Sequence, residues 1–194
     1  MLTDRQREII DTAMRILVEQ GTQRLTIRNV AAAIGVSEPA VYRHFASKHD
    51  LLVNLLETLQ ASILPIFRDH QIPPPQSLSE ALLNLMNAIF TRIEDNPAFA
   101  LFVFTEEAFH ADEELRPILA RMLLEMMAHI DRHLTHLQHA GMCRTDVSSQ
   151  FLAGTLLGLV RLAVTRWHLD ERNTSLVSQG PSLAASLAHL FTTS

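Results

Sequence analysis

Apolar residues recur every three or four positions along most of the chain, and glycines, prolines and polar caps separate the periodic stretches. This spacing is typical of amphipathic helices, and no stretch shows the alternation of a strand. The pattern therefore predicts an all-α protein of about nine helices. The predicted helices cover about 4–20, 26–34, 38–45, 47–67, 77–94, 98–109, 112–139, 146–169 and 181–191.

The stretch from Thr26 to Phe45 holds two short predicted helices around a glycine. Thr26 and Ser37 are typical N-cap residues, and Gly35 suits a left-handed turn. Val41 and Phe45 are four residues apart and share an inner face, so the rest of the second helix points outward. An outer face with Tyr, Arg and His suits the major groove of DNA, whereas an ordinary helical hairpin is the alternative.

These residues resemble the DNA-binding half of the TetR family of bacterial transcriptional regulators, over the N-terminal part of the chain. The resemblance implies an N-terminal three-helix helix-turn-helix domain at 1–46. It also implies a larger C-terminal helical domain at 47–194 for ligand binding and dimerisation, with 47–67 as a connecting helix. The matching residues are Thr26, Arg28, Ala31, Gly35, Val36, Ser37, Val41, Tyr42, Phe45, Ser47, Lys48, Leu51 and Leu52.

The resemblance also suggests which side chains contact DNA. Lys48, the single lysine, begins a predicted helix where N–H groups and the helix dipole favour phosphate; a solvated surface charge is the alternative. Glu38 is repelled by phosphate, so it accepts from a cytosine amino group, points away or selects against wrong sites. The expected DNA-contacting residues are Thr26, Arg28, Ser37, Glu38, Pro39, Ala40, Tyr42, Arg43, His44 and Lys48, with Arg5 and Arg7 as further phosphate candidates.

Composition limits the remaining possibilities. The 194 residues are 47% apolar and carry a net charge of −5, which indicates a globular protein rather than a nucleic-acid coat. The first fifty residues hold seven basic and six acidic side chains, so this segment is nearly neutral and the rest of the chain is acidic. Such a distribution suits a protein that contacts DNA at one end only. A lone cysteine (Cys143), a charged N-terminus and no apolar run long enough for a bilayer predict a cytoplasmic protein without a membrane partner.

The last two long helices are candidates for a homodimer interface. The helix that contains Phe151 to Val164 is apolar nearly all round and must be covered on every side. TetR-like proteins pair such helices into a four-helix bundle, although this helix also fits the centre of a monomer core. The expected interface residues are Phe151, Gly154, Gly158, Leu162, Leu183, Leu187 and Leu190.

The resemblance further implies a small-molecule pocket in the second domain, although phenylalanine and methionine at helical spacing are also typical of a packed core. His129, His133 and His136 share one predicted face, but they border an apolar stripe and we predict neither a metal nor a cofactor. The pocket candidates are Met86, Phe99, Phe102, Phe104, Glu106, Met122, Met126, His129, Leu156 and Arg161.

Taken together, the sequence predicts a dimeric regulator that binds a palindromic double-stranded operator and is released by a small apolar or amphipathic effector. Such a protein is usually a repressor in this family. A relative that organises chromosomes or cell division without an inducer is the alternative. No Ser–His–Asp order, phosphate loop or carboxylate pair stands out, so we expect no enzyme.

Overall fold

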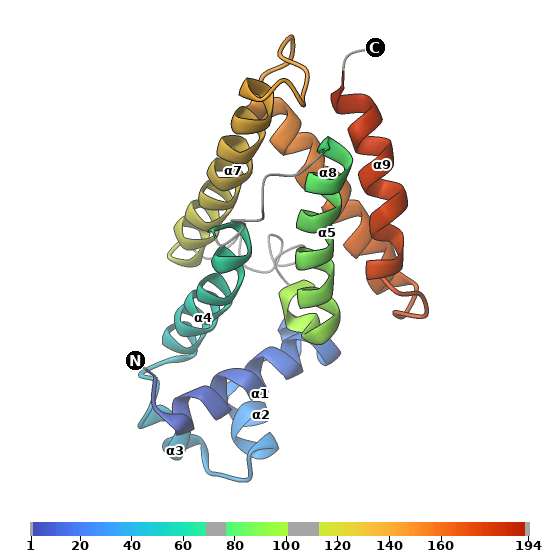
Figure 1. Ribbon diagram of the computed structural model, residues 1–194. Coiled ribbons are helices and arrows are strands. Elements are labelled where there is room, and N and C mark those ends of the chain that lie inside the picture. The colour runs from blue at the N-terminus through green and yellow to red at the C-terminus, as the bar shows by residue number, and fades with distance from the viewer. Residues whose placement is uncertain (1, 69–76, 101–112, 193–194) are drawn as a thin grey trace. The chain divides into compact units, whose positions relative to one another are not determined.

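The computed structural model describes residues 2–68, 77–100 and 113–192, which form helices and loops without a strand (Figure 1). The all-α prediction is confirmed. The predicted helix at 98–109 lies mostly outside the described residues. The α-helices are α1 (Asp4–Gln20), α2 (Ile27–Ala33), α3 (Glu38–Tyr42), α4 (Lys48–Arg68), α5 (Leu78–Asp95), α7 (Leu115–His139), α8 (Ser149–Leu169) and α9 (Gly180–Phe191), with short 3-10 helices η1 (Thr22–Arg24), η2 (Pro97–Ala100) and η3 (Val177–Gln179).

The chain divides into two compact units. The first contains residues 1–61 and 105–119, and the second contains 62–104 and 120–194. The first unit thus extends further along α4 than the helix-turn-helix domain expected at 1–46. Both α4 and α7 contribute residues to each unit.

Capping residues place the helix ends in the first unit. Thr3 and Gln6 form a capping box at α1, as the sequence predicts. The Thr26 hydroxyl oxygen accepts from the Asn29 N–H at 3.1 Å and begins α2. The Ser47 hydroxyl oxygen likewise accepts from the Asp50 N–H at 3.0 Å at the start of α4.

Some predicted helix limits were too long. α3 ends at Tyr42 instead of about Phe45, because the His44 N–H turns back to the Val41 carbonyl at 2.9 Å in a tighter, three-residue bond. α8 begins at Ser149 instead of Asp146, because the Ser148 hydroxyl caps the Phe151 N–H.

The second unit is organised around α5 and α9, which lie side by side (Figure 1). Gly180 permits this approach, since a Cβ there would lie 2.9 Å from the Asn87 Oδ1. Glu94, near the end of α5, accepts hydrogen bonds from the Ser175 hydroxyl and from the Leu176 and Val177 N–H groups that lead into η3. This carboxylate therefore fixes the chain just before α9.

The other end of α9 is held by the α7–α8 connection. The Arg144 N–H donates to the Phe191 carbonyl at 2.7 Å, and its guanidinium donates to the Leu190 carbonyl at 3.2 Å. The same guanidinium donates two hydrogen bonds to Asp146, and this contact lowers the pKa of the Asp146 carboxyl. A cation at the carboxyl end of a helix also complements the helix dipole.

None of the described helices combines the length and the apolar content needed to cross a membrane.

We predict that Glu94→Ala lowers the free energy of unfolding by about 1–3 kcal/mol, because three donors before α9 lose a charged acceptor. Denaturant titration measures this change. Asp95→Ala is the matched control, since the exposed Asp95 carboxylate neighbours Glu94 and makes none of these bonds. Equal midpoints for the two variants would contradict the assignment.

Candidate nucleic-acid interface

A tight turn joins α2 to α3. Gly35 has a φ of 70°, a region that side chains with a Cβ rarely adopt. The turn is closed by bonds from the Gly35 N–H to the Ala32 carbonyl at 3.2 Å and from the Val36 N–H to the Ala31 carbonyl at 2.9 Å. Its geometry sets the direction in which α3 leaves α2.

One face of α3 is fixed in the core of the first unit. Val41 and Phe45 are fully buried, as the spacing predicts. They join an apolar set contributed by α1, α2 and the segment between them. The other members are Ile9, Ile10, Ala13, Leu17, Leu25, Ile27, Val30 and Ala31.

The opposite face of α3 is open to solvent. Ser37, Glu38, Pro39 and Arg43 are exposed, and Tyr42 retains 48% of its surface. Ala40 and His44 are half-buried beside them. These six side chains with Tyr42 form what we define as the reading face of α3.

Ser37 occupies the N-cap position of α3 but makes no side-chain bond to the helix. The prediction that its hydroxyl caps α3 was therefore wrong. Pro39 already removes one of the N–H groups that a cap would satisfy. The exposed Ser37 hydroxyl therefore makes no bond to α3 that would compete with a phosphate contact.

Basic side chains of the first unit differ in their ion pairing. Arg5 pairs with Glu8 and Arg7 pairs with Asp4, both along α1, so these two guanidiniums are neutralised by their own helix. In contrast, the exposed Arg28, Arg43 and Lys48 have no ion pair within the described ranges. These three charges lie on α2, after α3 and at the start of α4, whereas Arg15 on α1 and Arg24 in η1 are also exposed without an ion pair within the described ranges.

Lys48 is the first residue of α4, directly after the cap residue Ser47. The Asp50 carboxylate accepts from the Ala46 N–H at 2.8 Å and so fixes the approach to this helix. The next residue, His49, contacts Glu114 just before α7, with Nε2 and Oε2 2.6 Å apart. Lys48 therefore lies at a well-defined helix start. The Asp50 carboxylate, two residues further along α4, is also close in the chain.

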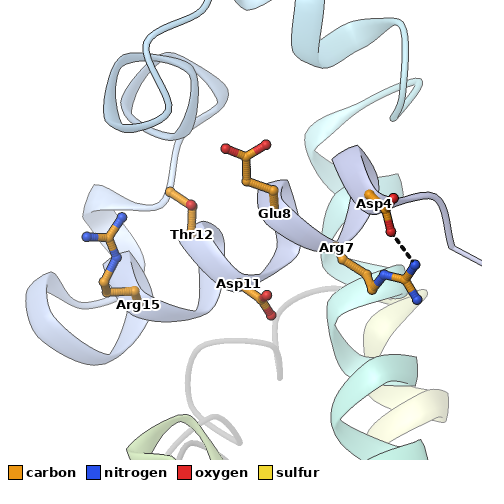
Figure 2. A pocket seen from close by; sticks show the side chains of 6 residues that line it. All are labelled: Asp4, Arg7, Glu8, Asp11, Thr12 and Arg15. Carbon is orange, nitrogen blue, oxygen red and sulfur yellow. Dashed lines mark hydrogen bonds and ion pairs between the residues drawn. The ribbon is translucent and has the colours of Figure 1, made fainter.

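A surface hollow of about 540 Å³ lies along α1. Its described lining comes from α1 alone, and Figure 2 shows the ion pair between Arg7 and Asp4 within it. Three carboxylates against two guanidiniums do not suit a phosphate backbone. This hollow is therefore separate in chemistry from the reading face. The lining residues are Asp4, Arg7, Glu8, Asp11, Thr12 and Arg15.

The predicted pocket residues occupy mixed environments. Met86, Phe99, Met122 and Leu156 are buried, and Arg92 lies over the Phe99 ring at 5.2 Å. These positions fit a packed core as well as a pocket wall. Met126 and His129 are half-buried, Arg161 is exposed, and Phe102, Phe104 and Glu106 lie outside the described residues.

The predicted histidine face shows no metal-like arrangement. Nδ1 of His129 lies 2.6 Å from the Arg132 guanidinium, and His136 is exposed. Across the described ranges, no three His, Cys, Asp or Glu side chains come together as metal ligands would.

The predicted dimer residues lie largely on one exposed strip. Phe151 retains 67% of its surface and Leu162 retains 56%, and Gly154 and Gly158 lie exposed between them. On α9, Leu190 retains 59% and Leu183 is half-buried. Leu187 differs, since only 2% of its surface is exposed and it lies in the core of its own chain.

A profile of bacterial regulatory proteins of the tetR family matches residues 9–55, which run from α1 through the reading face into α4. These residues of the chain match the DNA-binding region of the TetR family. The chain is 23% identical over 190 residues to the HTH-type transcriptional regulator AcrR of Shigella flexneri, covering 95% of this chain and 88% of that one. TetR-family relatives of this kind are DNA-binding transcription regulators.

Two further relatives differ in how much of this chain they match. The nucleoid occlusion factor SlmA of Photobacterium profundum is 44% identical over 62 residues, which cover 31% of this chain and 32% of that protein. FadR of Bacillus subtilis, solved in complex with stearoyl-CoA, has a TM-score of 0.79 at 21% identity and covers 94% of this chain and 97% of its own. This structural likeness shows that the fold extends through the second unit.

Gln6 has a contact that the sequence analysis did not predict. Its Nε2 donates to the His44 carbonyl at 3.3 Å, which joins α1 to the end of the reading face. The capping-box pattern predicts only the local bond to Thr3. Nothing in the sequence spacing marks a partner so far along the chain.

We predict that Gly35→Ala destabilises the protein by about 1 kcal/mol, because the left-handed backbone conformation is unfavourable for alanine. A Cβ at Gly35 meets no atom within 4 Å, so crowding does not contribute. Thermal unfolding measures the loss. Gly35→Asn should lose less, since asparagine tolerates this conformation; an equal loss would argue against a backbone cause.

Proposed function

We propose that this protein is a dimeric, sequence-specific DNA-binding regulator whose reading face enters the major groove. The observation that carries this proposal is the solvent-facing reading face, which includes the unpaired Arg43, together with Arg28 and Lys48, which are exposed without an ion pair within the described ranges. Cationic and hydroxyl groups suit phosphates, and Arg43 suits guanine edges. Glu38, Pro39, Ala40 and Arg43 would choose the operator sequence.

The dimer proposal rests on the exposed strip of α8. Phe151, Gly154, Gly158 and Leu162 follow a spacing of three or four residues and therefore share one face. A Cβ on Gly158 would meet nothing within 4 Å, so a second helix has room to approach its backbone. Leu183 and Leu190 of α9 would extend this surface, whereas the buried Leu187 supports it from below.

We further propose that the protein acts as a repressor and that a small apolar or amphipathic effector releases it. Relatives in this family include FadR, which was solved with stearoyl-CoA. An effector in the second unit would act through α4 and α7, which contribute to both units. The His49–Glu114 contact joins these helices next to Lys48. An effector shifts the equilibrium only if it binds the two states with different affinity.

A second candidate is a chromosome- or division-organising role without an inducer. The identity to the nucleoid occlusion factor SlmA of Photobacterium profundum supports it, although that match covers 31% of this chain. The burial of Met86, Phe99, Met122 and Leu156 also fits a second unit filled by its own side chains. Native mass spectrometry of the purified protein distinguishes the candidates: a bound small molecule favours the first.

Protection of DNA upstream of the protein's own gene tests the main proposal and supplies an operator. On that operator, we predict that Arg43→Ala costs about 1–3 kcal/mol and relaxes the choice of one base pair. Lys48→Ala should instead weaken specific and non-specific duplexes alike and reduce the salt slope by about one. Binding titrations over a range of salt concentrations measure both effects.

Arg121→Ala is the charge-matched control for these variants, since Arg121 is exposed on α7 in the second unit. It should leave DNA affinity unchanged. Operator binding that survived Arg43→Ala and Tyr42→Ala unchanged would remove the reading-face assignment.

We predict that Leu162→Asp converts the dimer to a monomer, because a charge replaces an exposed apolar side chain within the proposed interface. Analytical ultracentrifugation measures the mass. Leu124→Asp is the matched control, since Leu124 is also exposed but lies on α7. A wild-type monomer, or a Leu162→Asp variant that stays dimeric, would contradict the interface.

A further inference from the structure

We propose that Gln6 is a positioning residue for DNA recognition, because one side-chain amide holds both the start of α1 and the end of the reading face. The Gln6 Oε1 accepts from the Thr3 N–H at 3.0 Å and from the Thr3 hydroxyl at 3.2 Å. The Gln6 Nε2 donates to the His44 carbonyl at 3.3 Å. The amide therefore links the start of α1 to a carbonyl that lies 38 residues beyond Gln6 in the chain.

The chemistry of these partners specifies glutamine. The Thr3 backbone N–H can only donate and the His44 carbonyl can only accept, so the side chain between them must supply one acceptor and one donor. Glutamate would satisfy Thr3 but offers no donor to His44. Lysine and arginine would satisfy His44 but offer no acceptor to Thr3. Asparagine carries the right groups on a shorter side chain.

The bond matters because α3 has few restraints of its own. α3 has five residues, and Ser37 gives it no side-chain cap. Its inner face is held by Val41 and Phe45, which fix which side faces outward. Within the described ranges, the Gln6–His44 bond is the one hydrogen bond that joins α1 to residues 37–46. It therefore restrains the carboxyl end of the reading face, where Tyr42, Arg43 and His44 lie.

This inference rests on the proposed function, since it concerns how accurately the reading face is presented to bases. Base contacts require a fixed orientation, whereas phosphate contacts tolerate small movements of a flexible cation. Loss of the Gln6–His44 bond should therefore reduce specific binding more than non-specific binding. The quantity that reports this is the ratio of the two affinities.

Three variants of the full chain separate the contributions. Gln6→Glu keeps the acceptor for Thr3 and removes the donor to His44. Thr3→Ala removes the hydroxyl of the cap and leaves the Gln6–His44 bond in place. Gln23→Glu adds the same charge at an exposed position in the first unit and serves as the charge control.

Each variant is titrated with the footprinted operator and with a scrambled duplex, and amide hydrogen exchange is followed in the protein without DNA. Gln6→Glu should lower the specific-to-non-specific affinity ratio about fivefold relative to Gln23→Glu, with faster exchange at residues 43–46. Thr3→Ala should leave both quantities near the wild-type values.

An affinity ratio for Gln6→Glu equal to that of Gln23→Glu would overturn the recognition role. Unchanged exchange at residues 43–46 would overturn the restraint itself. If the wild-type protein shows no specific DNA binding, the proposed function fails, while the exchange measurement still decides whether Gln6 holds the end of the reading face.

Discussion

The burial of Val41 and Phe45 is the constraint on which the DNA-facing surface depends. Both side chains are fully buried, and their four-residue spacing fixes the rotation of α3 about its own axis. The remaining α3 side chains must then point outward. Tyr42 and Arg43 are exposed because Val41 and Phe45, on the other side of the helix, are buried in the core. Recognition chemistry is thus a consequence of core packing.

Charge pairing determines which cations remain for a nucleic acid. α1 neutralises Arg5 with Glu8 and Arg7 with Asp4, whereas Arg43 has no ion pair among the residues that the structure describes. Arg28, Arg43 and Lys48 therefore keep their charge at the surface, and the net charge of −5 for the whole chain does not by itself oppose the proposed DNA contact there.

Much of the fold could be predicted from the sequence, because its signals are local. Thr3 and Thr26 cap helices within three residues, and the structure contains both caps; of the two serines before α5, Ser77 and Ser79, the structure shows Ser77 as the cap. Gly35 marked the turn because its backbone conformation excludes most other residues. The end of α3 was misplaced because a five-residue helix has too few periodic positions to define its limit.

The sequence could not reveal contacts between distant segments. The pairing of Arg5 and Arg7 along α1 follows i,i+3 spacing, but that spacing does not say whether acids or phosphates take the charge. Leu187 looked like its apolar neighbours on α9, and only the packing of α5 against α9 separates it from Leu190. The Gln6–His44 bond depends on tertiary structure in the same way.

The division of α3 into a buried side and a solvent side separates folding from target choice. Glu38, Pro39 and Arg43 are exposed, and exposed positions usually tolerate substitution with changes within about 0.5 kcal/mol. Under the proposed function, mutations there would alter the preferred DNA sequence while Val41, Phe45 and Gly35 stay unchanged. A duplicated gene with this architecture could therefore acquire a new set of target genes in a few substitutions, each of which leaves the protein folded.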